Sequence, residues 1–169
     1  YLEAKKYLDK AYGYSLSLPY NHSERIRALS NYTLVLQSMG FYEKALMNLQ
    51  ECLTFEKDDS IDVPVILNNL CVVCASLGRY DLVIEYGEKA LSLLSSLSSL
   101  PKNEINNGMS LILNNISIAY YNLNIPNKAI EYLEKSLEIY RPINNDEYAT
   151  LLGNLGMFYS NLDFKKSLF

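Results

Sequence analysis

Few side chains in this sequence are of the kinds that carry out chemistry. The single histidine, His22, stands beside a predicted helix cap in a linker, where an imidazole is more often a surface group than a catalyst. Cys71 and Cys74 have the spacing of half a metal or redox motif, but no second pair accompanies them. These two thiols and Cys52 fall at close-packing positions of predicted helices, so we expect all three in the core and no metal or cofactor site.

The sequence also lacks the longer motifs of enzymes. No glycine-rich phosphate loop, nucleophile elbow or HExxH pair is present. The acidic residues lie mostly at exposed helix positions, where pairs such as Glu131 and Lys135 give weak helix support. We therefore expect a protein that is not an enzyme.

Asparagines are the polar residues with the most regular placement. Four of them precede successive predicted turns by the same number of residues, at intervals of 38, 46 and 39: Asn31, Asn69, Asn115 and Asn154. Asparagine is a mediocre residue inside a helix, because its side chain competes for backbone hydrogen bonds. A primary amide both donates and accepts, which matches the N–H and C=O groups of an extended peptide. The alternatives are bonding to the next helix, or drift in a chain with 17 asparagines among 169 residues.

Internal repetition supplies the helices that would position these amides. A small residue, a bulkier one four later and a small one three further on recur in residues 1–11, 41–53, 79–91 and 125–137, with Gly87 as an exception, and 163–169 begins a fifth copy. A second helical pattern precedes four of these segments, in residues 28–40, 66–78, 111–124 and 151–162. Gly40, Gly78 and Asn124 stand where the first helix must stop, whereas the last copy has Asp163 there. The pattern predicts helix–turn–helix units that stack into an all-α, right-handed solenoid.

The repeat resembles the tetratricopeptide repeat family. The resemblance rests on the small–large–small spacing of the second helix, the glycine at the turn, and an aromatic residue two positions later at Tyr42 and Tyr80. The tryptophan of the family's first helix is missing, with leucine at 29, 67, 113 and 152. The period near 40 exceeds the usual 34 and resembles kinesin light chain-type repeats.

The resemblance implies a concave groove lined by the first helices, where asparagines of the kinesin light chain-type repeats clamp bound peptides. The four aligned asparagines would then form a ladder that grips a peptide backbone. Further expected groove residues are Asn68, Asn114, Arg27, Leu34, Val72, Ile118 and Tyr121. Ser30 and Leu34 replace the lysine and asparagine with which chaperone-binding members hold a C-terminal carboxylate, so we expect a peptide with apolar side chains instead.

The predicted organisation is one solenoid of about four repeats with both ends truncated. Its parts are the second helix of a partial repeat (1–18), three repeats (22–58, 60–98 and 110–142), an inserted loop (99–109) and a partial repeat (145–169). The insertion is interpreted as a tolerated loop or kinked helix extension, or as a loop that contacts a partner. The chain is expected to be a piece of a longer protein or complex, because its last segment stops within an apparent helix.

Composition excludes several classes of function. The net charge of −4 and the pI near 5.0 provide no basic field for nucleic acid. No apolar run approaches the roughly 20 residues of a membrane span. Three cysteines cannot pair completely, which favours the reducing cytoplasm. We expect an adaptor that binds a protein segment in its groove. The alternatives are a structural subunit of a cytoskeletal or ciliary assembly, contacted through its convex face, and the regulatory region of a larger enzyme.

Overall fold

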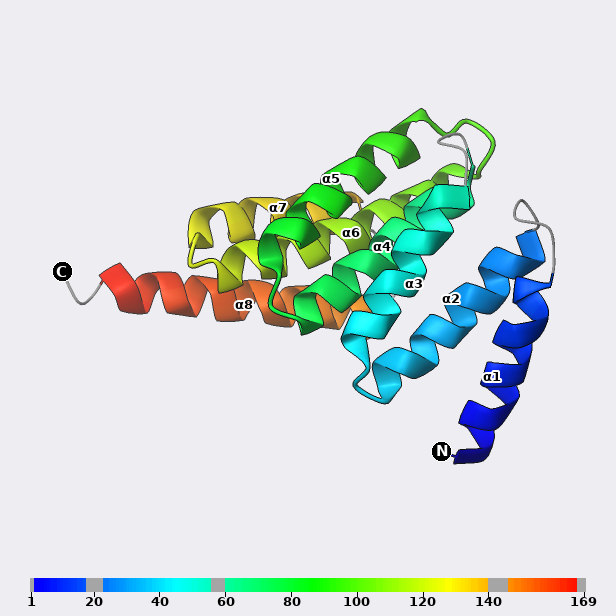
Figure 1. Cartoon of the computed structure of the whole chain (residues 1–169). Coiled ribbons are helices and arrows are strands. Elements are labelled where there is room, and N and C mark those ends of the chain that lie inside the picture. Colours follow the sequence, from blue (N-terminus) through cyan, green and yellow to red (C-terminus); the bar gives the residue numbers. More distant parts are fainter. Residues whose placement is uncertain (1, 18–22, 56–59, 140–145, 167–169) are drawn as a thin grey trace.

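A computed structural model of the chain describes residues 2–17, 23–55, 60–139 and 146–166. All regular structure in these ranges is helical, which confirms the predicted all-α solenoid. The helices are α1 (Leu2–Leu16), α2 (Ser23–Ser38), α3 (Tyr42–Phe55), α4 (Asp62–Ser76), α5 (Tyr80–Ser96), α6 (Lys102–Asn122), α7 (Pro126–Ile139) and α8 (Asp146–Lys166). Each helix packs against the next one in the chain, and α4 also packs directly against α6 (Figure 1).

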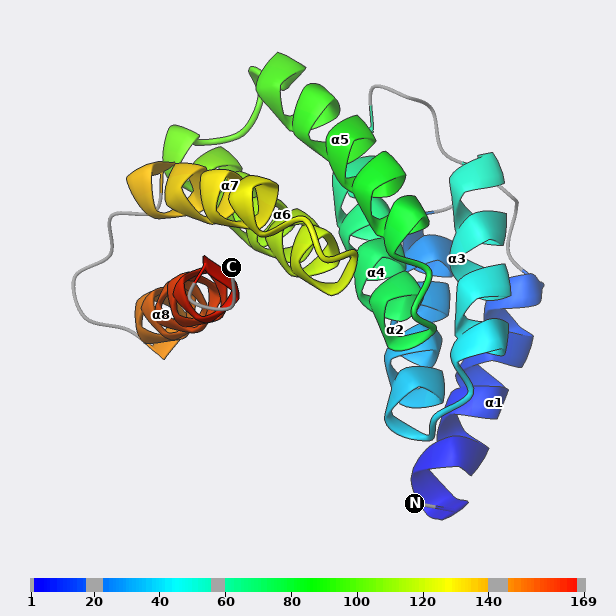
Figure 2. The same ribbon diagram turned by 90° about the vertical axis from the view of Figure 1, so that its left-hand side faces the viewer.

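The helices form two rows that follow a curved path (Figure 2). The first helices of the repeats, α2, α4, α6 and α8, make up the inner row, and the second helices α3, α5 and α7 lie outside them. Helix α1 stands at one end of the arc and α8 at the other. This arrangement brings the helices that carry the aligned asparagines to the inner side.

Three turns between the helices of a pair share one hydrogen-bonding pattern. Gly40, Gly78 and Asn124 have φ values of 78°, 69° and 64°. The N–H of the following residue donates to a carbonyl five residues earlier, as from Arg79 to Cys74 at 2.9 Å and from Ile125 to Tyr120 at 2.9 Å. This is the Schellman arrangement, which needs a residue that tolerates the left-handed conformation. The turn residues identified from the sequence therefore end these helices.

The fourth expected turn does not form. Helix α8 continues through Leu162 and Asp163 to Lys166, so the prediction that a second helix begins at residue 163 is wrong for the described part of that segment. The aligned position carries Asp163 instead of glycine or asparagine, and the helix continues where the other repeats turn.

Of the two interpretations of residues 99–109, an inserted loop or a helix extension, the structure excludes the loop for most of the segment and shows a helix. Helix α6 begins at Lys102, directly after Pro101, and runs for 21 residues. Proline has no N–H to lose at a helix start and its φ of −56° suits the entry into the first turn. Gly108 lies inside α6, where a β-carbon would come within 3.2 Å of Leu94 Cδ1 on α5. The glycine therefore permits close packing of the two helices and does not end α6.

The small–large–small pattern of the second helices forms the centre of the core. Its positions in α3, α5 and α7 are all buried: Ala45, Leu49, Cys52, Val83, Gly87, Ala90, Ala129, Leu133 and Ser136. At the smallest slot of α7, the Ser136 hydroxyl donates to the Ser110 carbonyl at 2.9 Å, and the two serine Oγ atoms are 2.7 Å apart. Small residues thus allow the helices of a repeat to approach closely, as the pattern predicts.

Candidate functional site

Two asparagine pairs join three consecutive inner helices. The Asn115 side chain on α6 donates through Nδ2 to Asn68 Oδ1 on α4, at 3.0 Å. The Asn154 side chain on α8 donates in the same way to Asn114 Oδ1 on α6, at 3.1 Å. All four side chains are partly buried. In each pair, one of the four aligned asparagines donates to the asparagine that stands one position before the aligned residue on the preceding inner helix.

The other two column residues are placed differently. Asn69 is partly buried on α4, and Asn31 is exposed on α2. The described parts of α2 and α4 do not pack as closely as α4 and α6 do. The structure thus brings Asn115 and Asn154 into amide pairs with Asn68 and Asn114, and it does not bring Asn31 into the same chain of contacts.

Two clefts open beside the amide pairs on the inner row. The larger, of about 290 Å³, lies between α4 and α6 and is lined by Val65, Asn68, Glu104 and Leu111, among others. The smaller, of about 100 Å³, lies between α6 and α8, and Leu111, Asn114 and Glu147 contribute to it. Leu111 borders both clefts, so they flank α6 on its two sides. Each cleft contains the accepting asparagine of one amide pair.

Apolar side chains are exposed along the same helices. Their exposed fractions lie between 41% and 57%: Leu34, Val65, Val72, Leu111, Leu152 and Met157. Of these six, Val65 and Leu111 line the clefts themselves. Leu34 and Val72 were expected in the groove, and the structure leaves both open to a ligand.

Two further predicted groove residues take part in packing. Ile118 is half-buried against the core. The ring of Tyr121 stacks on Phe158 of α8 with centroids 4.5 Å apart, and its hydroxyl accepts a hydrogen bond from Asn161 Nδ2 at 2.8 Å. Tyr121 therefore helps to hold α8 against α6. The side chain of Arg27 lies outside the described residues, as does His22.

Comparison with known proteins finds one family match within the chain. Residues 111–147 match the family model of the tetratricopeptide repeat. This segment of the chain is a tetratricopeptide repeat. The matching segment begins within α6, at residue 111, and continues through the turn and α7 to the start of α8, so it includes both Asn114 and Asn115.

Solved structures of low sequence identity share the fold of this chain, a solenoid like those of tetratricopeptide-repeat proteins. The nearly identical TPR-like repeats of a kinesin light chain from Podosopora anserina are 14% identical, with a TM-score of 0.76 over 98% of this chain and 81% of theirs. BtubC (BKLC) from P. vanneervenii is 20% identical, with a TM-score of 0.71 over 85% of this chain and 59% of its own length. The Sgt2 TPR domain from Aspergillus fumigatus is 16% identical, with a TM-score of 0.68 over 88% and 85%. No curated protein sequence matches the chain significantly.

The thiols of the core are buried, as expected. Cys52, Cys71 and Cys74 form no disulfide and are inaccessible to solvent. Burial raises the pKa of Cys71 to about 12 and that of Cys74 to about 11. The Cys71 thiol donates to the Val83 carbonyl, with the sulfur 3.4 Å from the oxygen. Over the described residues, no group of histidine, cysteine, aspartate and glutamate side chains could hold a metal ion, and no helix is long and apolar enough to span a membrane.

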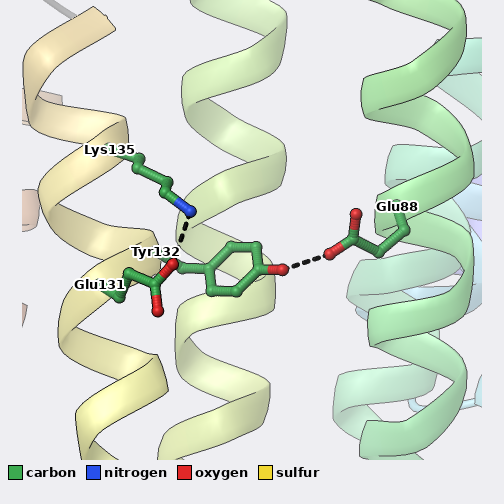
Figure 3. A network of polar contacts seen from close by, with 4 residues as sticks. All are labelled: Glu88, Glu131, Tyr132 and Lys135. Atoms are coloured by element: carbon green, nitrogen blue, oxygen red, sulfur yellow. Dashed lines mark hydrogen bonds and ion pairs between the residues drawn. The ribbon is translucent and has the colours of Figure 1, made fainter.

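A periodic set of contacts on the outer row was not anticipated from the sequence. Gln50 on α3 donates to the Tyr86 hydroxyl on α5 at 3.2 Å, and the Tyr132 hydroxyl on α7 donates to Glu88 on α5 (Figure 3). Gln50 and Glu88 are 38 residues apart, and Tyr86 and Tyr132 are 46 apart, which are the repeat intervals of the second helices. These contacts use the polar groups of the outer row to join neighbouring repeats. The matching residues could have been found by aligning the second helices.

The Tyr132 contact has further support within α7. Lys135 Nζ lies 5.1 Å from the centroid of the Tyr132 ring and bonds to Glu131 at 2.7 Å (Figure 3). Burial, together with the bond to Glu88, raises the pKa of Tyr132. The hydroxyl therefore stays protonated and remains a donor to Glu88 well into the alkaline range.

Proposed function

We propose that this chain is a non-catalytic protein-interaction module that binds an extended peptide segment on the inner row. The paired amides at the two clefts carry the proposal. Asn68 lines the larger cleft and Asn114 the smaller one, and each accepts a hydrogen bond from the next inner helix. The proposed ligand crosses α6 at Leu111, which borders both clefts.

The amides have capacity for a ligand in addition to their mutual bonds. A primary amide has two N–H donors and two acceptor lone pairs, and each pair uses one donor and one acceptor. The partner amide also fixes the orientation of the side chain, so less conformational entropy is lost when a peptide binds. Four bonds to a peptide backbone, each contributing about 0.5–1.5 kcal/mol, would supply about 2–6 kcal/mol. The exposed leucine and valine side chains beside them would contact apolar side chains of the ligand.

The outer row is a weaker candidate for the main binding face. Tyr86, Tyr132, Glu88 and Gln50 already join neighbouring repeats there. In the inner row, exposed apolar side chains are part of the clefts themselves, at Val65 and Leu111. We also propose a cytoplasmic location, because a chain whose three cysteines form no disulfide suits a reducing compartment.

A selection from a random peptide library on the purified chain, followed by affinity measurements, tests this function. Asn68→Ala and Asn114→Ala are each expected to weaken selected peptides by roughly 3- to 10-fold, which corresponds to one or two lost hydrogen bonds. Asn127→Ala is the matched control, because Asn127 is exposed on α7 in the outer row. Melting temperatures of all three variants separate loss of ligand contact from loss of fold.

The structural alternative gives a different result. If the amide pairs only brace the inner helices, Asn68→Ala and Asn114→Ala should lower the melting temperature while peptide affinities of the folded variants stay at the wild-type value. Failure of the library to yield any peptide that competes for the inner row would contradict the proposed function.

A further inference from the structure

One side of α8 is exposed at positions that are buried in the other inner helices. The leucine two positions before the aligned asparagine is at most 5% exposed in α2, α4 and α6, whereas Leu152 of α8 is 47% exposed. The residue five positions after that asparagine is at most 9% exposed in the same three helices, whereas Tyr159 is 41% exposed. Between them, a β-carbon added at Gly156 would have nothing within 4 Å. These three residues are spaced by four and three positions and form the open face of α8.

The second helix of the same repeat covers this side of the earlier inner helices. The Cys71 thiol of α4 donates to the Val83 carbonyl of α5, and the Tyr120 ring of α6 lies 5.2 Å from the Tyr132 ring of α7. Helix α8 continues past Leu162, where the other inner helices turn. Among the described helices, none therefore takes the place of a second helix on α8.

We propose that a second copy of the chain supplies this second helix, by packing its α1 on the open face of α8. Residues 4–11 of α1 read Ala-Lys-Lys-Tyr-Leu-Asp-Lys-Ala, and the aligned residues 129–136 of α7 read Ala-Ile-Glu-Tyr-Leu-Glu-Lys-Ser. Tyr7 and Tyr14 of α1 are 68% and 76% exposed. Because α1 and α8 lie at opposite ends of the arc, the copies join head to tail and continue the two rows of helices (Figure 2).

The contacts of the outer row extend across the same junction. Within the chain, Tyr132 of α7 donates to Glu88 of α5. Glu134 aligns with Glu88, and Tyr7 aligns with Tyr132. We therefore expect Tyr7 of one copy to donate to Glu134 of the next. Glu134 accepts from the Tyr159 hydroxyl through Oε1 at 2.7 Å, and a carboxylate has a second oxygen that can accept from Tyr7.

The charges of the two ends are complementary. Helix α1 has three lysines and two acidic residues, whereas α7 and α8 together have six acidic residues and four lysines. Exposed ion pairs contribute little, so burial of Leu152 and Tyr159 supplies most of the affinity. Neither of these residues lines the clefts beside α6, and the contact is thus separate from the proposed peptide site.

Sedimentation equilibrium of the purified chain over a range of concentrations tests the proposal. The mean mass should rise beyond that of a dimer, because a head-to-tail contact leaves one face free at each end. Leu152→Glu should weaken the association roughly 10- to 100-fold, since it removes a leucine that the contact buries. Leu111→Glu is the matched control, because Leu111 is 45% exposed on α6 in the middle of the arc. A mass of one chain at every concentration would overturn the proposal.

Mixing two variants identifies the faces that meet. Tyr7→Glu impairs the α1 side, and Leu152→Glu impairs the α8 side. Each variant alone should be largely monomeric, whereas an equimolar mixture should form a dimer through its two intact faces and nothing larger. A mixture that stays monomeric while the wild type associates would show that other surfaces meet, and so would a Leu111→Glu variant as impaired as Leu152→Glu. Both results would overturn the proposal.

The fold of the variants is checked separately. Tyr7 and Leu152 are largely exposed within one chain, so melting temperatures of dilute samples should stay at the wild-type value. Leu152→Ser is a second variant of the α8 side that introduces no charge. It should also form a dimer when mixed with Tyr7→Glu, and failure to do so would count against the head-to-tail contact.

Discussion

Ile116 of α6 occupies the space that a side chain at Gly87 of α5 would need. A β-carbon built on Gly87 would lie 2.6 Å from Ile116 Cγ1 and 2.8 Å from its Cδ1. Gly87 is the exception to the bulky position of the second-helix pattern, and Ile116 is fully buried. The missing side chain on one helix is therefore filled by a branched side chain of the next.

Gly87→Ala is expected to destabilise the chain despite alanine's better helix propensity. Forcing additional atoms into a packed core costs about 1–3 kcal/mol, whereas the propensity gain is about 1 kcal/mol. Gly156→Ala on α8 provides the control, because nothing lies within 4 Å of its added β-carbon. Urea unfolding should show a lower midpoint for the first variant and a higher one for the second. A stabilised Gly87→Ala would contradict the packing described for this position.

Gly78→Ala should lower stability through the backbone alone. The residue has a φ of 69° and open space around its β-carbon position, so strain and not collision is the cause. The left-handed conformation costs a residue with a β-carbon about 1–2 kcal/mol. Gly13→Ala in α1 is the comparison, since it also adds a methyl group in open space but at an ordinary helical φ. Thermal melts followed by circular dichroism should place the two variants on opposite sides of the wild type.

The three thiols should be unreactive in the folded chain. Cys52, Cys71 and Cys74 are fully buried, and burial raises the pKa of Cys71 to about 12 and that of Cys74 to about 11. Titration with Ellman's reagent at pH 8 should therefore release almost no thiolate until denaturant is added, and then three equivalents. Rapid reaction of one thiol without denaturant would show that a cysteine is accessible.

The thiols of Cys71 and Cys74 make the free energy of unfolding depend on pH in the alkaline range. Their pKa values in the folded chain lie above the ordinary value of 9.0. Between the ordinary pKa and the raised one, the folded state therefore binds more protons than the unfolded state. Their contribution is complete below about pH 9 and is lost as the pH rises toward 11 and 12. Urea midpoints measured from pH 7 to pH 11 should fall at the alkaline end, and less so in a Cys71→Ala variant compared with its own value at pH 7.

Tyr132→Phe should weaken the connection between α5 and α7. It removes the hydroxyl that donates to Glu88 and leaves the ring, which lies 5.2 Å from the Tyr120 ring. Because Glu88 is exposed, we expect a loss of only about 0.5–1 kcal/mol. Glu88→Gln keeps an acceptor and should cost less in the same urea titration. A Tyr132→Phe variant as stable as the wild type would show that the contact contributes nothing in solution.

Much of the fold could be predicted from the sequence because its signals are local. The small–large–small spacing identifies the buried face of each second helix, and Gly40 and Gly78 mark turns that only a few residue types can make. The errors occurred where a local signal has two meanings. Gly108 suggests a break in a helix, but in α6 it makes room for Leu94. That distinction depends on a residue of another helix.

The site was predicted only in part for a similar reason. The column of asparagines follows from counting back from the turns, and the double asparagines at 68–69 and 114–115 are visible in the sequence. The bond from Asn115 to Asn68 depends on how far α6 is shifted along α4, which the spacing within each helix does not specify. The clefts depend on the same shift. The carboxylate at Glu104 was missed because the segment around it was expected to be a loop.

Adjacent asparagines on α6 bond to the inner helices on its two sides. Asn115 donates toward α4, and Asn114 accepts from α8, so two successive residues of one helix couple three repeats. A force that separates α4 from α8 would act on both amide bonds of α6. In the outer row, the same force would act on contacts such as that of Tyr132 with Glu88. In a repeat protein each unit contacts only its neighbours, so the stability is approximately a sum over single repeats and the interfaces between adjacent ones. On the inner row, the coupling between the repeats of α4 and α8 therefore depends on the two asparagines of α6.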